Sequence, residues 1–228
     1  MFGWGKPRRP QVVAFDIIGT VFPLEPLRPA VVALGLPPAG LEGWFAAGLR
    51  DAFALSSAGD FQPFLHVLGG ALDQVLAEQH LTPSKAACGR LLDGMRHLPA
   101  RPDARDAFEV IVKAGLRIIA LSNGSSASTQ SLLKAAYLDH LVERIVSVED
   151  VKLFKPRHEV YAHAARVTKV KAKRLALVAV HPWDINGAKA AGLTTAYVSA
   201  ERLFPGTMRS PDVKAPSLAA AARALIAL

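Results

Sequence analysis

Four short apolar runs, separated by stretches with helical periodicity, constrain the fold of this chain more than any other feature. The runs cover residues 12–15, 116–121, 175–180 and 194–198, and a shorter candidate covers 145–147. Buried strands that alternate with helices are typical of a parallel sheet with helices on both faces. The helices between and after the strands are expected at about residues 103–113, 127–137, 158–167, 183–191 and 217–228. The sequence therefore predicts an α/β protein with a Rossmann-like parallel sheet.

A block without strand signals interrupts this alternation directly after the first strand. It begins with Pro23, Pro26 and Pro29 and continues with three helical stretches. These are expected at about residues 41–53, 61–80 and 82–96, and the last should begin with Thr82 as N-cap and Pro83 in the first turn. We interpret residues 23–97 as a small inserted helical cap domain, and residues 1–22 and 98–228 as the core domain.

Composition sets further limits. The chain has 228 residues, of which 51% are hydrophobic and 20% charged, so it can bury a sizeable core. It contains no run of eighteen uncharged apolar residues, and we expect no membrane partner. Residues 1–9 lack the apolar stretch of a signal peptide, which favours a cytoplasmic protein. Cys88 is the only cysteine, which excludes an internal disulfide and a cysteine-based metal cluster.

The formal net charge of +8 has two interpretations. The surface is simply rich in arginine and lysine, or the protein binds an anion, either a nucleic acid or a small acid. The densest basic stretch, residues 166–174, has no interleaved aromatic residue and no nucleic-acid motif. We interpret this stretch as a solvated helix end and loop, and expect no nucleic-acid partner.

Three groups of polar residues lie where predicted strands end. They are Asp16 with Thr20, Ser122 with Asn123, and His181 with Asp184, and Lys155 stands between the last two groups in the sequence. Each has an ordinary structural explanation by itself, as a turn residue, a helix cap or a surface lysine. In a parallel sheet, however, the strand ends face one crevice, where ligands bind. One shared site explains these residues better than four separate coincidences.

The chemistry of these side chains assigns their roles. Asp16 is a candidate nucleophile that forms an ester with the substrate. Lys155 can supply positive charge, and Ser122, Asn123 and Thr20 can supply hydrogen bonds. Asp184 can hold Lys155 and help to orient or activate the water that cleaves the ester.

The same segments resemble the four motifs of the haloacid dehalogenase (HAD) superfamily in order and spacing. They are residues 15–21, residues 121–124, Lys155 with Pro156, and residues 183–188. The predicted cap lies where this family inserts one. The spacing of Lys155 and Tyr161, and the neighbourhood of Trp183, resemble the 2-haloacid dehalogenase (type II) branch. The resemblance implies a HAD fold, a small anionic substrate and a homodimer.

Two positions separate this chain from the phosphatases of that superfamily. Phosphatases carry a second aspartate two residues after the nucleophile, where this chain has Ile18. They carry a magnesium-binding aspartate four residues before Asp184, where this chain has Val180. Because magnesium requires oxygen ligands, we expect no metal and no cofactor. A missing proton donor matters little for expelling halide.

The leaving-group site departs from the dehalogenase pattern. Phe45 follows Trp44, where the resemblance implies a halide-binding arginine, and Arg50 is a weaker substitute further along the helix. His181 replaces an asparagine and Ala179 a serine. His181 either donates a hydrogen bond or positive charge to the halide, or is an ordinary turn residue. The expected substrate-binding residues are Asn123, Ile17, Ile18, His181, Trp183, Phe45, Phe61, Leu49 and Tyr161.

We therefore predict a hydrolytic dehalogenase that converts short 2-haloacids to 2-hydroxyacids through an aspartyl ester. Two alternatives remain open. One is a small-molecule phosphatase that works despite Ile18. The other is a HAD-fold binding protein whose catalytic site has decayed.

Overall fold

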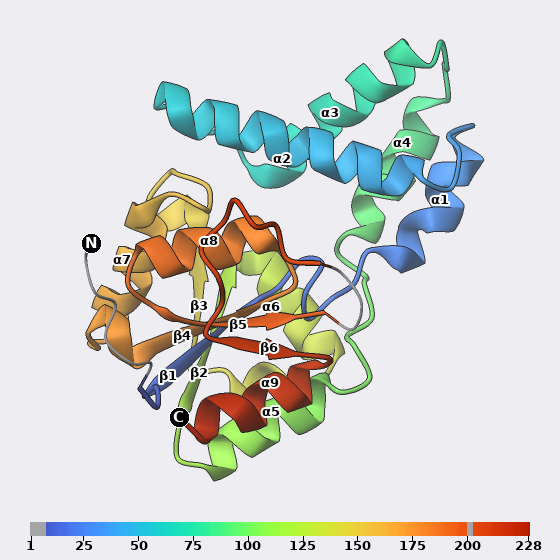
Figure 1. Ribbon diagram of the computed structural model, residues 1–228. Coiled ribbons are helices and arrows are strands. Elements are labelled where there is room, and N and C mark those ends of the chain that lie inside the picture. Colours follow the sequence, from blue (N-terminus) through green and yellow to red (C-terminus); the bar gives the residue numbers. More distant parts are fainter. Residues whose placement is uncertain (1–7, 200–202) are drawn as a thin grey trace.

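A six-stranded parallel sheet forms the centre of the protein, in a computed structural model that describes residues 8–199 and 203–228 (Figure 1). The strand order is β3-β2-β1-β4-β5-β6. Their bounds are β1 Val12–Asp16, β2 Arg117–Ser122, β3 Arg144–Ser147, β4 Leu175–Ala179, β5 Thr194–Val198 and β6 Val213–Ala215. The predicted α/β class with a parallel sheet is confirmed.

Two helical layers cover the sheet. Helices α5 (Ala104–Lys113) and α9 (Leu218–Ile226) lie on one face, and α7 (His158–Val167) and α8 (Pro182–Ala190) on the other (Figure 1). Helix α6 (Ser126–Ala135) contacts β2 and β3. Every residue of β1 is buried, and the ring of Phe15 lies 4.5 Å from that of Phe108 in α5. Burial on both faces explains why β1 is a continuous apolar run.

Four helices, α1 to α4, form a group apart from the sheet (Figure 1). They are α1 Arg28–Ala33, α2 Gly40–Ala58, α3 Phe64–Glu78 and α4 Lys85–Gly94. The Nε1 atom of Trp44 in α2 donates to the carbonyl of Leu68 in α3 at 2.9 Å. At the other end of α2, the backbone N–H of Phe154 donates to Ser56 Oγ at 2.8 Å, which joins this helix to the core. All four helices fall within residues 23–97; the division into cap and core domains stays a prediction.

Three local predictions were wrong or incomplete. Helix α4 begins after Ser84, not Thr82, because the Ser84 hydroxyl accepts the backbone N–H of Ala87 at 3.2 Å. Helix α1 was not predicted, because Pro29 was interpreted as a break although it stands in the first turn, where its missing N–H is tolerated. Strand β6 was missed, because its three residues form no apolar run.

Three further predictions concern the basic stretch, membrane-spanning helices and a signal peptide. In the basic stretch, Arg166, Lys169, Lys171 and Lys173 are exposed, as expected of a solvated helix end and loop. No helix in the described residues has the length and apolarity required to cross a membrane. The prediction that no signal peptide is present rests mainly on residues 1–7, which lie outside the described residues.

Candidate active site

Asp16 is the last residue of β1, and a tight turn follows it. The backbone N–H of Phe22 donates to the Ile17 carbonyl at 3.0 Å, and that of Gly19 donates to the Phe22 carbonyl at 2.8 Å. Gly19 has φ +85°, a left-handed conformation that favours glycine. The turn therefore leaves the strand sharply and holds Asp16 at the carboxyl edge of the sheet.

Lys155 joins the two carboxylates of the site. Its Nζ atom lies 2.8 Å from Asp16 Oδ1 and 2.7 Å from Asp184 Oδ2, and donates to the Leu121 carbonyl at 3.0 Å. Lys155 and Asp184 are fully buried, and the Asp16 side chain is 4% exposed. Three segments of the chain, distant in sequence, thus meet at one ammonium group, as predicted from the strand ends.

The charges of this cluster do not cancel, because one lysine serves two carboxylates. Burial raises the pKa of Asp184, and the charge of Asp16 raises it further against the opposing effect of Lys155. Burial alone would lower the pKa of Lys155, but Asp16 and Asp184 outweigh it and the pKa is raised. The site therefore holds the lysine charged and carries excess negative charge, which makes Asp184 more basic than an exposed aspartate.

Thr20 holds the second oxygen of Asp16. Its hydroxyl donates to Asp16 Oδ2 at 2.5 Å and accepts the backbone N–H of Val180 at 3.1 Å. This buried hydroxyl thus acts as a donor and as an acceptor at the same time. The threonine ties the carboxylate to the end of β4 and sets its orientation.

Tyr161 holds the second oxygen of Asp184. Its hydroxyl donates to Asp184 Oδ1 at 2.5 Å, and the side chain is fully buried. Burial and the nearby Asp184 charge raise the pKa of Tyr161 well above 10, so the phenol stays a donor. The contact shows that Tyr161 orients Asp184, and the substrate-binding role expected of Tyr161 from the sequence stays a prediction.

Ser122 and Asn123 hold the loops around Asp16. Asn123 Oδ1 accepts the backbone N–H of Lys155 at 3.1 Å, and Ser122 Oγ accepts the backbone N–H of Gly124 at 2.9 Å. Both side chains are buried. Asn123 therefore fixes the lysine segment next to β2, while the substrate contacts predicted for it remain a prediction.

This set of residues does not fit a magnesium ion. The two Asp184 oxygens are occupied by Lys155 and Tyr161, and Val180 offers no side-chain oxygen. The Ile18 carbonyl, the only oxygen at its position, lies 3.1 Å from His181 Nε2. Magnesium needs near-octahedral oxygen ligation. Among residues 8–199 and 203–228, no group of three His, Cys, Asp or Glu side chains is arranged to hold a metal.

His181 stands between Asp16 and an aromatic wall. Its Nε2 atom lies 3.6 Å from Asp16 Oδ2 and 3.1 Å from the Ile18 carbonyl. Because a carbonyl only accepts, Nε2 carries a hydrogen in this contact. The imidazole stacks on Trp183, with ring centroids 5.1 Å apart, and lies 6.0 Å from the ring of Phe45. His181 therefore lies beside Asp16 and lines a cavity, where it can meet a ligand.

The other predicted substrate-binding residues lie in different places. Leu49 and Phe45 line a cavity with His181. Ile18 lines a second cavity of about 230 Å³ with Phe64 and Leu68, whereas Ile17 is fully buried. Phe61 instead stacks on Phe154, with ring centroids 5.1 Å apart, and so supports the segment before Lys155.

Arg50 is not a substitute for the missing cap arginine. Its guanidinium is exposed and bonds Asp51 at 2.8 Å and Gln74 at 2.7 Å, on the surface of the helical group. Because these partners hold it on the surface, the structure gives Arg50 no place beside Asp16.

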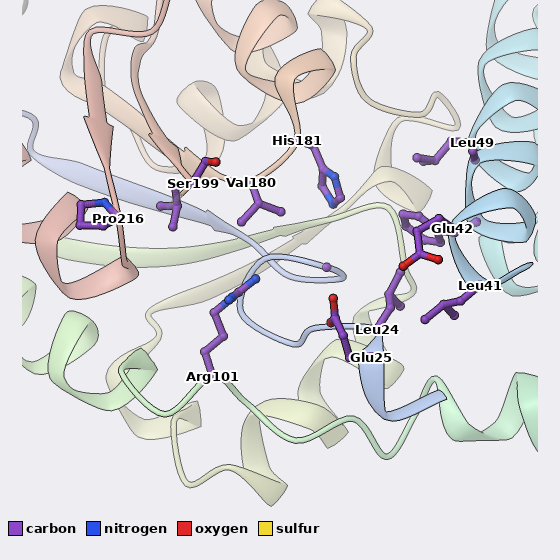
Figure 2. Close-up of a pocket in the computed structure, with 14 residues that line it drawn as sticks. Leu24, Glu25, Leu41, Glu42, Leu49, Arg101, Val180, His181, Ser199 and Pro216 are labelled. Atoms are coloured by element: carbon purple, nitrogen blue, oxygen red, sulfur yellow. The ribbon is translucent and has the colours of Figure 1, made fainter. Parts of the chain in front are cut away.

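Sequence reasoning missed Arg101, which belongs to the segment that returns from α4 to the core. Its Nε atom donates to the Thr20 carbonyl at 2.7 Å, and its backbone N–H donates to the Val21 carbonyl at 2.8 Å. Arg101 and His181 line the same cavity, whose volume is about 490 Å³. Figure 2 shows how these two side chains lie. The only sequence signal was an arginine between two prolines, which by itself indicates nothing about a site.

Known proteins resemble this chain over most of its length. The model of the haloacid dehalogenase-like hydrolases matches residues 10–192. The (S)-2-haloacid dehalogenase 4A of Burkholderia cepacia is 28% identical over 156 residues, 68% of each chain. The haloacetate dehalogenase H-2 of Moraxella sp. (strain B) is 23% identical over 210 residues, 90% of this chain and 93% of the relative.

Solved structures show the same fold. The L-2-haloacid dehalogenase of Xanthobacter autotrophicus, with chloropropionic acid covalently bound, superposes with a TM-score of 0.85. The two chains are 22% identical, and the alignment covers 94% of this chain and 97% of the other. At this identity the similarity establishes a shared fold.

Proposed function

Because this chain belongs to the haloacid dehalogenase-like hydrolases, we propose that it hydrolyses short 2-haloacids to 2-hydroxyacids and halide. One observation carries the proposal. Asp16 lies at the end of β1 with Lys155 and Thr20 on its two oxygens, and no proton donor stands two residues later at Ile18. This arrangement suits a carboxylate nucleophile and a leaving group that needs no proton.

The first step is a displacement. An Asp16 oxygen attacks the carbon that bears the halogen, a carbon–oxygen bond forms, and halide departs with the electron pair of the carbon–halogen bond. Oδ2 faces the His181 side of the site, where Nε2 lies 3.6 Å away. We assign the attack to Oδ2, because Lys155 then remains on Oδ1. His181 and the Phe45 ring border the space on that side.

The second step is hydrolysis of the ester. Water attacks the carboxyl carbon of Asp16, the ester bond breaks at that carbon, and the 2-hydroxyacid leaves. Lys155 Nζ, 2.8 Å from Oδ1, stabilises the negative charge that develops on this oxygen. Once Asp16 is esterified, Asp184 is the remaining carboxylate of the cluster. Burial, the largest cause of its raised pKa, persists in the ester, so we assign Asp184 to accept the proton of the water and return it to the departing alkoxide.

The test is halide release without added metal. Wild-type protein should release chloride from 2-chloropropionate, and Asp16→Asn should not. In a single turnover in oxygen-18 water, one label should enter the Asp16 carboxylate, as measured by mass spectrometry of the peptide. Absence of release from every short haloacid, together with unlabelled Asp16, would refute the proposal.

Two further parts of the proposal concern assembly and location. We propose a homodimer in the cytoplasm, on the strength of the family resemblance and the sequence. Light scattering after gel filtration should give twice the 24.3 kDa mass of the chain. A monomer at all protein concentrations would contradict the dimer without affecting the chemistry.

A further inference from the structure

The cavity beside His181 is larger than a three-carbon acid requires. Its volume is about 490 Å³, within the range of about 300–1,000 Å³ that holds larger ligands. It runs from Gly19 and His181, next to the nucleophile, along the ends of β4, β5 and β6 to Val198 and Pro216. Asp16 itself does not line the cavity, but His181, 3.6 Å from Asp16 Oδ2, does. A substrate with its reacting carbon at Asp16 would therefore extend into the cavity past His181.

Arg101 places a cation in this cavity. Its backbone N–H and its Nε atom are both fixed to the turn after Asp16, through Val21 and Thr20. Neither Nη atom has a hydrogen-bond or ion-pair partner among the residues that the structure describes. Figure 2 shows the guanidinium of Arg101 and the ring of His181 entering the cavity from opposite sides. A guanidinium held by one edge presents its other edge to a carboxylate, which it binds with two parallel hydrogen bonds.

The remaining walls suit a short carbon chain between two charged ends. Phe45, Leu49 and Leu41 line the side formed by α2, and Val180 lines the side formed by the core. Apolar walls with few polar groups are typical of pockets that orient a ligand by its ends.

Two carboxylates also border the cavity. Glu42 is paired with Arg28, at 2.6 Å between Oε1 and Nη2. Glu25 is exposed to solvent, where screening weakens its repulsion of an anion. Arg101 is half-buried and bound to the turn that follows Asp16. Its charge is therefore screened less than that of Glu25 and acts more strongly on an anion in the cavity.

We propose that this cavity is a second subsite that binds the distal carboxylate of a 2-halo dicarboxylic acid, such as 2-chlorosuccinate or 2-chloroglutarate. The inference rests on the proposed function and specifies its substrate class. Asp16 acts on the halogenated carbon, and Arg101 pairs with the far carboxylate across the apolar walls.

The matched substitution is Arg101→Gln. The glutamine Nε2 stands as far along the side chain as the arginine Nε, so it retains a donor for the Thr20 carbonyl while the charged Nη end is removed. Wild type should prefer 2-chloroglutarate to 2-chlorobutyrate in kcat/KM, and Arg101→Gln should lower this preference about tenfold. Arg50→Gln removes an exposed arginine and should leave the preference unchanged.

A binding measurement separates the inference from the proposed chemistry. Glutarate has no leaving group, so calorimetry can measure its binding whether or not the protein is a dehalogenase. Glutarate should bind wild type more tightly than butyrate, and Arg101→Gln should abolish the difference. Glu25→Gln removes negative charge beside the subsite and should strengthen glutarate binding; weaker binding would indicate that the subsite does not hold an anion.

Two results would overturn the inference. One is equal kcat/KM and equal binding for the mono- and dicarboxylates with wild type. The other is an Arg101→Gln variant that loses activity on both substrates by the same factor, which would assign Arg101 to support of the Thr20 turn. Failure of halide release alone, with glutarate binding that depends on Arg101, would refute the dehalogenase proposal and leave the subsite standing.

Discussion

The hydroxyl of Tyr161 donates to Oδ1 of Asp184 at 2.5 Å, and both side chains are fully buried. This contact lies behind the reactive part of the site. It leaves Asp184 Oδ2 to Lys155, at 2.7 Å, and so fixes the direction in which the carboxylate faces the ammonium. Tyr161 therefore orients Asp184 without a hydrogen bond to Asp16.

Tyr161→Phe should destabilise the protein by about 1–3 kcal/mol, because it leaves a buried carboxylate oxygen without its donor. The measurement is urea unfolding, together with the pH dependence of kcat. Loss of the phenol donor should raise the pKa of Asp184 further and shift the acidic limb of the kcat profile upward. Tyr197→Phe is the control: Tyr197 is also buried, and its hydroxyl bonds no described residue. Equal effects of the two substitutions would contradict the positioning role.

Lys155→Met should destabilise the protein more than Tyr161→Phe, by about 3–5 kcal/mol, because it leaves two buried carboxylates without their shared cation. The stability of this variant should rise as the pH falls, because protonating one carboxylate removes their repulsion. Unfolding experiments between pH 4 and 8 would measure both effects. In the variant Asp16→Asn with Lys155→Met, part of the stability should return. A Lys155→Met variant with stability independent of pH would show that the two carboxylates do not repel each other.

Wild type should lose stability in strong alkali through Lys155. Its pKa is raised in the folded protein above the ordinary value of 10.5. A raised pKa means that the folded state binds the proton more tightly. The contribution of Lys155 is therefore fully present below pH 10.5 and is lost as the pH rises through the folded value. The difference in unfolding free energy between wild type and Lys155→Met should shrink above that pH, and a constant difference would contradict the assignment.

Gly19→Ala should impair both stability and activity. Its φ is +85°, and a Cβ at this position would lie 2.6 Å from His181 Nε2, so the imidazole must move. Gly115→Ala is the matched control, because Gly115 has φ +75° and no atom within 4 Å of such a Cβ. The control should lose only the stability that backbone strain costs, about 1–2 kcal/mol. Gly19→Ala should lose more stability than the control.

Halide release separates the two glycine variants further, because only Gly19 borders the reacting side of Asp16. Replacing His181 by alanine in the Gly19→Ala background should recover part of the lost stability, since the clash is removed. Equal destabilisation by Gly19→Ala and Gly115→Ala would show that the His181 imidazole can move away without any loss of stability.

The sequence by itself determined the α/β architecture and the cluster of Asp16, Lys155 and Asp184. Both depend on local patterns: a buried strand is a run of apolar residues, and in a parallel sheet the residues that follow each strand lie at one edge. The order of these segments in the chain was sufficient to predict that their side chains meet. Short or capped elements were less visible, as the missed β6 and the Ser84 cap show.

Only the tertiary structure decided how the charges are shared and what lies around them. Three features depend on contacts between distant segments. Tyr161 stands behind Asp184, His181 packs closely against Gly19, and Arg101 lines the cavity beside His181. Arg101 and Thr20, for example, are 81 residues apart in the chain. No periodicity or motif encodes such a pair, because each side chain's direction is set by how the elements pack against one another.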